Sequence, residues 1–299
     1  MIDLAGRTNA WWEQFGFLEY LRAIVKGIRT SLWPTKTQRQ LVRAKSNLTK
    51  PRSVIFFTTH KCASTFVSGR PFRAIFSGSQ YKLIDYANAI WTSGKRLDLQ
   101  GRHEEFLSNA YSELYSMHGA IYAPQRRHLD FPGRELFRHI FFLRDPRDIL
   151  ISSYYSVAFT HPVPYRSESR KRMAQSRATA REQEIDDYVM GQAETWLKPL
   201  FEQYILLRES AEDSLYLKYD FFVENTAEFV RELCNFLHLN PDSKAVKLLI
   251  DQATPVQKTE VMRHKRSGRS GQYIEKLRPD TVNALNDMLA NVLDYWEFR

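Results

Sequence analysis

The chain of 299 residues is 43% hydrophobic and 26% charged, values typical of an ordinary soluble globular protein with one large α/β domain or two small ones. Its two cysteines, Cys62 and Cys234, exclude a disulfide framework, and neither belongs to a CxxC pair of the kind that binds zinc. No apolar run approaches the roughly 18–20 residues that span a bilayer, and no signal peptide is visible, so we expect a cytoplasmic protein. The net charge of +9 favours anionic ligands, nucleic acid or membranes, and composition does not choose among them.

The first fifty residues differ from the rest of the chain. Between residues 11 and 32 apolar side chains recur near a 3.5-residue period, which predicts an amphipathic helix that ends near Trp33-Pro34. Such a helix either packs on the main domain or lies peripherally on an anionic membrane. We therefore divide the chain into an N-terminal helical arm and linker, residues 1–50, and a main domain, residues 51–299.

From Ser53 onward, apolar strand-like runs alternate with amphipathic helices. The predicted strands are Val54–Thr58, Lys82–Ile84, Ala120–Tyr122, His139–Leu143 and Leu215–Lys218. The predicted helices are Phe66–Phe76, Asp148–Val157, Glu184–Arg208, Glu224–Leu237 and Asp280–Trp296. This alternation predicts an α/β fold of three layers, with a mostly parallel central sheet flanked by helices. Two stretches break the pattern, the basic segment 165–181 and the Gly/Arg-rich segment 263–272.

The first predicted strand, Val54–Thr58, runs into a short polar turn with features of a phosphate site. The first turn of the helix that follows offers unpaired N–H groups and the positive end of the helix dipole. Lys61 adds a full positive charge, and Ser64 and Thr65 add hydroxyl donors. The segment therefore predicts a phosphate-binding loop, and the alternative is a plain turn in which Ser64 only caps a helix.

Two familiar phosphate chemistries do not fit this loop. The Walker A sequence needs two glycines and a lysine directly before Ser or Thr, whereas Lys61 precedes Ser64 by three positions and the loop has no glycine. A cysteine phosphatase needs an arginine shortly after its nucleophile, and Ser68 stands at that distance from Cys62. The loop is therefore of another kind.

A second strand, residues 139–143, runs into a charged turn and then a helix. Arg144 falls at the carboxyl end of this strand, where open α/β sheets place their ligands. Ser152 follows eight residues later, about two turns into the helix. Taken alone, the segment has a simpler interpretation, in which Arg144 or Arg147 pairs with neighbouring aspartates in a surface network.

A third segment, Arg266-Ser-Gly-Arg-Ser-Gly271, combines two glycines with two arginines. The glycines allow the backbone to approach a ligand closely, and the arginines supply forked donors for a phosphate. Taken alone, it is a flexible, solvated basic loop.

Together and in this order, the three segments resemble the PAPS-dependent sulfotransferases, which take a sulfuryl group from 3′-phosphoadenosine 5′-phosphosulfate (PAPS) and release PAP. Thr59–Phe66 is similar to that family's 5′-phosphosulfate loop, P-K-S/A-G-T-T-W. The segment from Arg144 to Ser152 is similar to its 3′-phosphate segment, and Arg266–Gly271 to its closing R-K-G-x-x-G loop. The resemblance covers roughly Ser53 to Trp296 and implies a P-loop-like nucleotide-binding core.

The resemblance also implies a set of nucleotide-binding residues. Lys61 would neutralise charge on the breaking bridging oxygen, Phe66 would lie beside the adenine, and Tyr219, in a pair similar to the family's Y-E-D segment, would reach the adenine. The implied binding residues are Lys61, Cys62, Ala63, Ser64, Thr65, Phe66, Arg144, Ser152, Tyr219, Arg266, Ser267 and Gly268. No metal is implied.

The chain departs from the family pattern in three places. Cys62-Ala63 stands where serine-glycine is commoner, so the turn is more constrained. Ser267 replaces a lysine of the closing loop and removes one cation near the 3′-phosphate. The short dimer motif of cytosolic members is present only as Thr281-Val282, so the oligomeric state is left open.

An acceptor alcohol, phenol or amine needs a general base. The resemblance implies a histidine at a strand end between the two nucleotide segments, and His118 fits that place in the sequence. Imidazole suits the role because its pKa lies near neutrality. His60, His103 and Glu104 are the alternatives.

The sequence does not identify the acceptor, which could be a glycan, a lipid or a small molecule. The basic segment 165–181 would favour an anionic acceptor if it flanked the acceptor site, and it is otherwise a solvated loop or a frayed helix. Two other functions are considered, a P-loop-like kinase and a non-enzymatic module that binds nucleic acid or membranes. The kinase lacks a clear carboxylate for Mg²⁺, and the binding module leaves three ordered phosphate-type segments unexplained. We expect no nucleic-acid partner.

Overall fold

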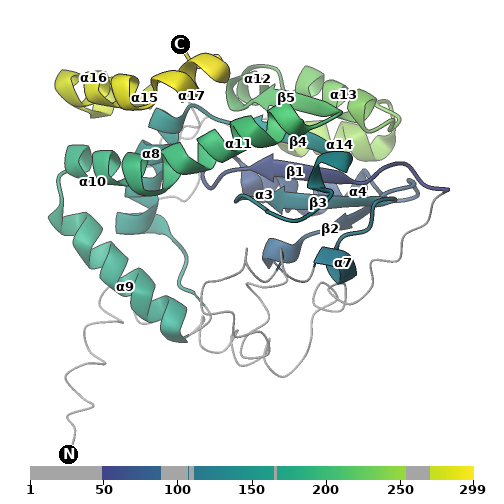
Figure 1. Ribbon diagram of the computed structural model, residues 1–299, viewed down its shortest axis with the longest axis horizontal. Coiled ribbons are helices and arrows are strands. Elements are labelled where there is room, and N and C mark those ends of the chain that lie inside the picture. The colour runs from purple at the N-terminus through teal and green to yellow at the C-terminus, as the bar shows by residue number, and fades with distance from the viewer. Residues whose placement is uncertain (1–48, 89–106, 108–110, 165–166, 254–269) are drawn as a thin grey trace, which may run out of the picture.

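The computed structural model describes residues 49–88, 107, 111–164, 167–253 and 270–299. Within these ranges, five parallel strands form one sheet in the order β2-β3-β1-β4-β5 (Figure 1). The strands are β1 (Val54–Thr58), β2 (Lys82–Ile84), β3 (Ala120–Gln125), β4 (Arg138–Leu143) and β5 (Ser214–Lys218). The predicted parallel sheet is therefore confirmed, and β3 extends three residues beyond its predicted end.

The central strand β1 is buried along its whole length, as its unbroken apolar run predicts. It pairs with β3 on one side and with β4 on the other, so that Val54 lies opposite both Ile121 and Arg138. Because side chains alternate along a strand, Ile55 and Phe57 enter one core and Val54 enters the other.

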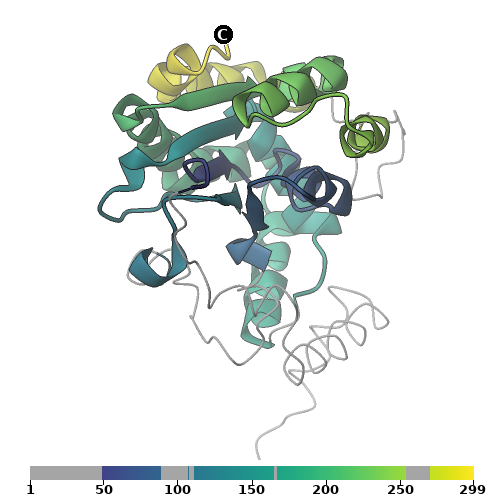
Figure 2. The ribbon, with the colours of Figure 1, turned by 90° about the vertical axis from the view of Figure 1, so that its right-hand side faces the viewer.

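Helices cover both faces of the sheet and complete the three predicted layers (Figures 1 and 2). The first core lies under α8 (Pro146–Tyr155), α10 (Ile185–Gln192), α11 (Lys198–Ser210), α16 (Pro279–Met288) and α17 (Ala290–Tyr295). The second lies under α3 (Ser64–Val67), α4 (Arg70–Ala74), α12 (Tyr219–Glu224), α13 (Thr226–Phe236) and α14 (Lys244–Ala253). The remaining helical elements are α7 (Tyr111–Leu114), η3 (Arg134–Leu136), η4 (Ser156–Thr160), α9 (Ser167–Glu182), η5 (Ala193–Leu197) and α15 (Gln272–Lys276). Both views place the C-terminal helices (yellow) next to the edge strand β5.

Two predicted helices are each divided in the structure. The helix predicted over 66–76 begins earlier and is broken into α3 and α4, because Gly69 takes an extended conformation and Pro71 starts a new helix. The helix predicted over 224–237 is preceded by the separate α12. Asn225 ends α12 and starts α13, where its side chain accepts a hydrogen bond from the Glu228 N–H at 3.2 Å.

A turn of π-helix follows α8, and another precedes α11. The element η4 prolongs α8, and η5 joins α10 to α11 within the single helix that the sequence predicts over 184–208. Pro199, in the first turn of α11, has no N–H to donate to the preceding turn, which accounts for the wider turn at this point.

From residue 167 onward the basic segment is neither a solvated loop nor a frayed helix, because residues 167–182 form α9 (Figure 1), which packs along η4. Arg177 donates to the Val157 carbonyl at 3.0 Å and to the His161 carbonyl at 2.8 Å, and Arg181 donates to the Ala158 carbonyl at 2.8 Å. The last carbonyls of a helix lack partners within it, so these arginines complete the end of η4. Part of the basic charge in this segment is therefore structural.

Several residues named from the sequence lie outside the described residues. They are the N-terminal arm, His103, Glu104 and the closing-loop residues Arg266, Ser267 and Gly268. In the parts of the chain that the structure describes, no helix is both long enough and apolar enough to cross a membrane.

Candidate active site

The carboxyl ends of the five parallel strands lie at one edge of the sheet, where ligands bind in open α/β folds. The loop with Lys61 follows the central strand β1, Arg144 follows β4, and Tyr219 follows β5. Because β1, β4 and β5 are successive neighbours, these three side chains start from adjacent positions along the edge.

The loop after β1 holds two non-glycine residues in the left-handed region. Lys61 has φ 69°, and Ala63 has φ 40° and ψ 26°. This conformation costs a residue with a Cβ roughly 1–2 kcal/mol. The constraint predicted from the missing glycine is therefore present in the backbone, and backbone strain of this kind is concentrated at ligand sites.

Cys62 anchors the loop to the sheet. Its thiol is fully buried and donates to the Phe142 carbonyl of β4 at 3.2 Å, while the Thr58 hydroxyl donates to the Cys62 carbonyl at 3.4 Å. Burial raises the pKa of this thiol to about 12, so it stays protonated and is a poor nucleophile. Deeper in the same turn, the hydroxyl of Thr59 is buried without a hydrogen-bond partner.

Arg144 joins the ends of the three strands. Its side chain is 3% exposed, and one of its Nη atoms donates to the carbonyl of Lys61 at 3.4 Å. The other lies 3.5 Å from the Asp148 carboxylate, and the guanidinium lies over the ring of Tyr219 at 4.7 Å. The structure therefore brings together the backbone of the Lys61 turn, the strand-end arginine and the tyrosine that the sequence named separately.

Aromatic rings of the second core lie next to Arg144. The half-buried ring of Phe66 lies 4.8 Å from that of Phe222, and Phe222 lies 6.2 Å from Tyr219. Ser152, named for the 3′-phosphate, is half-buried within α8, the helix that begins directly after Arg144.

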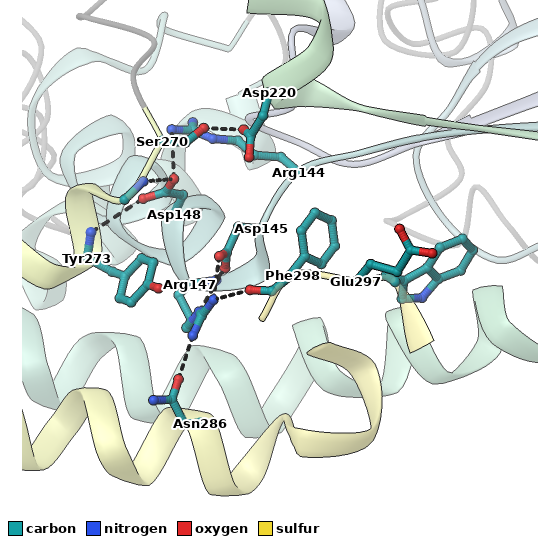
Figure 3. Close-up of polar contacts among 12 residues, drawn as sticks. Arg144, Asp145, Arg147, Asp148, Asp220, Ser270, Tyr273, Asn286, Glu297 and Phe298 are labelled. Carbon is teal, nitrogen blue, oxygen red and sulfur yellow. Dashed lines mark hydrogen bonds and ion pairs between the residues drawn. The ribbon is translucent and has the colours of Figure 1, made fainter. Parts of the chain in front are cut away.

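Asp148 connects Arg144 to the segment that follows the closing loop (Figure 3). Its carboxylate accepts hydrogen bonds from the N–H groups of Gly271 at 2.9 Å and of Tyr273 at 3.3 Å, at the start of α15. Burial raises the pKa of Asp148, and the nearby charge of Arg144 opposes that rise. Ser270, the first described residue after the closing loop, donates to Asp220 beside Tyr219. The chain after the closing loop is thus held on both the β4 and the β5 sides.

Arg147 has a structural role in the same turn (Figure 3). Its guanidinium is bound by Asp145 at 2.6 Å, by the Asn286 side chain at 2.6 Å and by the Phe298 carbonyl at 2.6 Å. It also lies over the ring of Tyr273 at 4.1 Å. Both aspartate pairings considered from the sequence, Arg144 with Asp148 and Arg147 with Asp145, therefore exist, but they are buried and do not form a surface network.

The structure places His118 at the opposite edge of the sheet from Lys61. It precedes the first residue of β3 and forms an isolated bridge with Arg52, which precedes β1. The six residues of β3 separate it from the carboxyl edge by roughly 20 Å. This distance argues against His118 as the general base, because such a base must reach the acceptor oxygen at hydrogen-bond distance.

Charged residues that were not predicted from the sequence follow β2 and β3 at the carboxyl edge. Asp85 comes directly after β2, is 1% exposed, and accepts a hydrogen bond from the Asn88 N–H on one oxygen while the other is buried without a partner. Arg126 comes directly after β3, and its Nε is likewise buried without a partner. If the predicted strand had ended at Gln125 instead of Tyr122, Arg126 would have been recognised as a residue at the carboxyl end of a strand.

His60 lies beside Lys61 and is the described alternative to His118. It is exposed at the turn, yet the surrounding protein and the charges of Arg126, Arg127, His161 and Lys61 lower its pKa to about 3. A base with so low a pKa takes up a proton weakly at neutral pH.

In the described ranges, no three His, Cys, Asp or Glu side chains gather as a metal site would require.

The sequence profile of the sulfotransferase domain family matches residues 134–296, which is more than half of the chain. The chain belongs to this family. A comparison with curated protein sequences gives no match. The family match favours the sulfotransferase prediction over the kinase and the non-enzymatic binding module.

Solved structures share the fold at low sequence identity. The mouse sulfotransferase SULT7A1, solved with PAP, has a TM-score of 0.52 at 10% identity, with 87% of this chain and 90% of that chain covered. A retinol dehydratase solved with retinol and PAP has a TM-score of 0.50 at 11% identity, with 82% of each chain covered. The three-layer α/β fold of this sulfotransferase is therefore shared with nucleotide-bound relatives.

Proposed function

We propose that this sulfotransferase transfers the sulfuryl group of PAPS to a hydroxyl or amine of a small-molecule acceptor at the carboxyl edge of β1, β3 and β4, releasing PAP. The observation that carries the proposal is the contact of Arg144 with the Lys61 carbonyl, which joins a strand-end arginine to a strained turn around a lysine. This contact holds a strand-end arginine against the backbone of the lysine turn, so two anion-binding positions adjoin, which suits a nucleotide with two phosphate positions.

The residues around this contact fit PAPS. Lys61 and the N–H and hydroxyl groups of the turn, together with the unpartnered Thr59 hydroxyl, would bind the 5′-phosphosulfate. Arg144 and Ser152 would bind the 3′-phosphate, with the closing-loop residues Arg266, Ser267 and Gly268 as further ligands by family resemblance. Phe66 and Tyr219 would border the adenine.

Sulfuryl transfer, like phosphoryl transfer, passes through a loose in-line transition state, so positioning and charge stabilisation contribute most of the rate. Lys61 would place its ammonium at the bridging oxygen, where negative charge develops as the bond to sulfur breaks. Arg144 fixes the Lys61 carbonyl and therefore the turn that carries this lysine.

The general base that the geometry supports best is Asp85, in place of His118. Burial raises the pKa of Asp85, while the hydrogen bond from the Asn88 N–H and the charges of Arg126 and Arg73 act against that rise. A base with a raised pKa takes the acceptor proton more readily at neutral pH than His60. Asp85 follows β2, two strands from β1, so an acceptor hydroxyl would lie between this carboxylate and Lys61.

A thermal-shift comparison of PAP, ATP with Mg²⁺, and RNA tests the proposed function. We expect PAP to raise the Tm, because a ligand that binds the folded state stabilises it. Stabilisation by ATP with Mg²⁺ but not by PAP would contradict the proposal. Asp85→Asn should abolish turnover with little change in PAP affinity, and His60→Ala is the matched control. A larger loss of turnover in His60→Ala than in Asp85→Asn would transfer the base role to His60.

A further inference from the structure

The carboxyl edge carries more positive charge than the proposed nucleotide site uses. Arg144 stands on the β4 side of the central strand, whereas Arg126 and Arg127 follow β3 on the other side. The charges of Arg126, Arg127 and His161 all act on His60, so these groups gather around the turn that carries Lys61.

Arg126 is the most informative member of this group. Its Nε is buried, and no hydrogen bond or ion pair to its guanidinium is found within the described residues. Arginines with buried atoms are usually paired, because an uncompensated buried charge is costly. Asp85 and Tyr204 act on Arg126 electrostatically, but neither forms an ion pair or hydrogen bond with it. The lowered pKa of Arg126, which burial causes first of all, agrees with an incompletely compensated charge.

The arginines of α9 do not take this role. Arg177 and Arg181 donate to backbone carbonyls of η4 and His161, and Arg170 donates to the Pro164 carbonyl at 3.3 Å. These hydrogen bonds hold α9 against η4 and the residues that follow it, although the Nε of Arg170 is buried without a hydrogen-bond partner. Because the arginines of α9 hold the fold together, the guanidinium groups that suit a bound anion are those at the end of β3 and not those of the basic segment 165–181.

We propose that the acceptor is a hydroxylated small-molecule acid, whose carboxylate or phosphate is bound by Arg126 and Arg127 while its hydroxyl faces Lys61. This inference rests on the proposed function. Neighbouring strands are separated by roughly 5 Å, so an anion bound at the end of β3 lies about one ring's length from a hydroxyl at the end of β1. An arginine fork binds such anions with two parallel hydrogen bonds.

Binding titrations with two matched pairs of probes test this inference on the PAP-saturated full-length protein. The pairs are 4-hydroxyphenylacetate with 4-hydroxyphenylacetamide, and glucuronate with glucuronamide. Within each pair, the acid and the amide have the same hydroxyl groups and nearly the same shape. We expect at least one acid to bind tenfold or more tightly than its amide, and Arg126→Gln to remove that preference. Arg172→Ala, an exposed arginine on α9, is the matched control and should keep it.

The outcomes separate this inference from the proposed function. If PAP binds but no acid binds more tightly than its amide at millimolar concentration, the acidic acceptor is wrong and the nucleotide site stands. If Arg126→Gln retains the preference, the anion is bound elsewhere and the assignment is wrong. If PAP fails to bind, the proposed function fails first. Arg127→Gln, at an exposed position, gives the same readout should the Arg126 variant not fold.

Discussion

Replacing Asp148 by asparagine separates the charge of this carboxylate from its shape. Asp148 is 1% exposed, lies 3.5 Å from Arg144, and accepts hydrogen bonds from the N–H groups of Gly271 and Tyr273. The asparagine retains one acceptor oxygen but loses the charge, so Arg144 is left as a buried cation without its carboxylate partner. The start of α15, which follows the closing loop, loses one of its two anchors.

The expected cost follows from these contacts. A hydrogen bond to a charged acceptor contributes about 1.5–3 kcal/mol, and one to a neutral acceptor about 0.5–1.5 kcal/mol. Removing one partner of a buried ion pair costs about 3–5 kcal/mol, but the long separation of Arg144 and Asp148 places this pair below that range. We expect Asp148→Asn to lower the free energy of unfolding by about 2–4 kcal/mol, because relief of the buried carboxylate offsets part of the loss. For a domain of this size, that corresponds to a decrease in Tm of roughly 4–16 °C.

Calorimetric unfolding with and without PAP measures both consequences. Asp148→Asn should also weaken PAP binding tenfold or more, because Arg144 and the end of the closing loop are both released. Asp294→Asn is the matched control, since its ion pair with Arg299 is exposed and should contribute less than about 1 kcal/mol. If Asp148→Asn changes the Tm no more than Asp294→Asn, or leaves PAP affinity intact, the account of this network is wrong.

Three further predictions concern stability. Ala63→Gly should stabilise the protein by up to about 1 kcal/mol in urea titration, since glycine adopts the left-handed conformation without strain, and equal or lower stability would contradict strain at this turn. The folded-state pKa of Asp85 is raised above its unfolded value, so ionisation of this carboxyl destabilises the fold as pH rises. Asp85→Asn should therefore have a higher Tm than wild type at pH 7 and lose that gain below about pH 4. A Tm difference that stays constant across this range would refute the direction of the pKa shift. Arg177→Met should cost about 2–4 kcal/mol in the same titration, because it leaves the carbonyls of Val157 and His161 without their donor, while PAP affinity stays unchanged. A selective loss of PAP affinity would assign Arg177 to the nucleotide site.

The sheet was predictable because its three central strands, β3, β1 and β4, are buried along their whole length. Val54–Thr58 and Lys82–Ile84 were predicted with their observed bounds, since polar turns follow them directly. Helix boundaries were harder, because Gly69 and Asn225 divide amphipathic patterns that continue on either side of them. Periodicity reports which face is buried and does not report where the backbone turns.

At the site, the strand-end positions of Lys61 and Arg144 could be predicted, since both follow apolar strands. Their contact through the Lys61 carbonyl depends on the order of the strands, which one sequence does not supply. His118 was chosen because its distance along the sequence from Arg144 fits the family. The structure places it before β3, at the amino end of the strand, and not after it. The roles of Arg177 and Arg181 at the end of η4 arise from helix packing that composition does not reveal.

The central claim is that Lys61 and Arg144 bind the two ends of one nucleotide. Calorimetric titration of PAP and of 5′-AMP, which lacks the 3′-phosphate, into wild type, Arg144→Ala and Lys61→Ala tests it most directly. The account predicts that Arg144→Ala weakens PAP by about 1.5–3 kcal/mol more than 5′-AMP, since a hydrogen bond to a charged group is worth about that much. Lys61→Ala should weaken both nucleotides alike. Equal losses for PAP and 5′-AMP in Arg144→Ala would show that Arg144 does not bind the 3′-phosphate and would contradict the account.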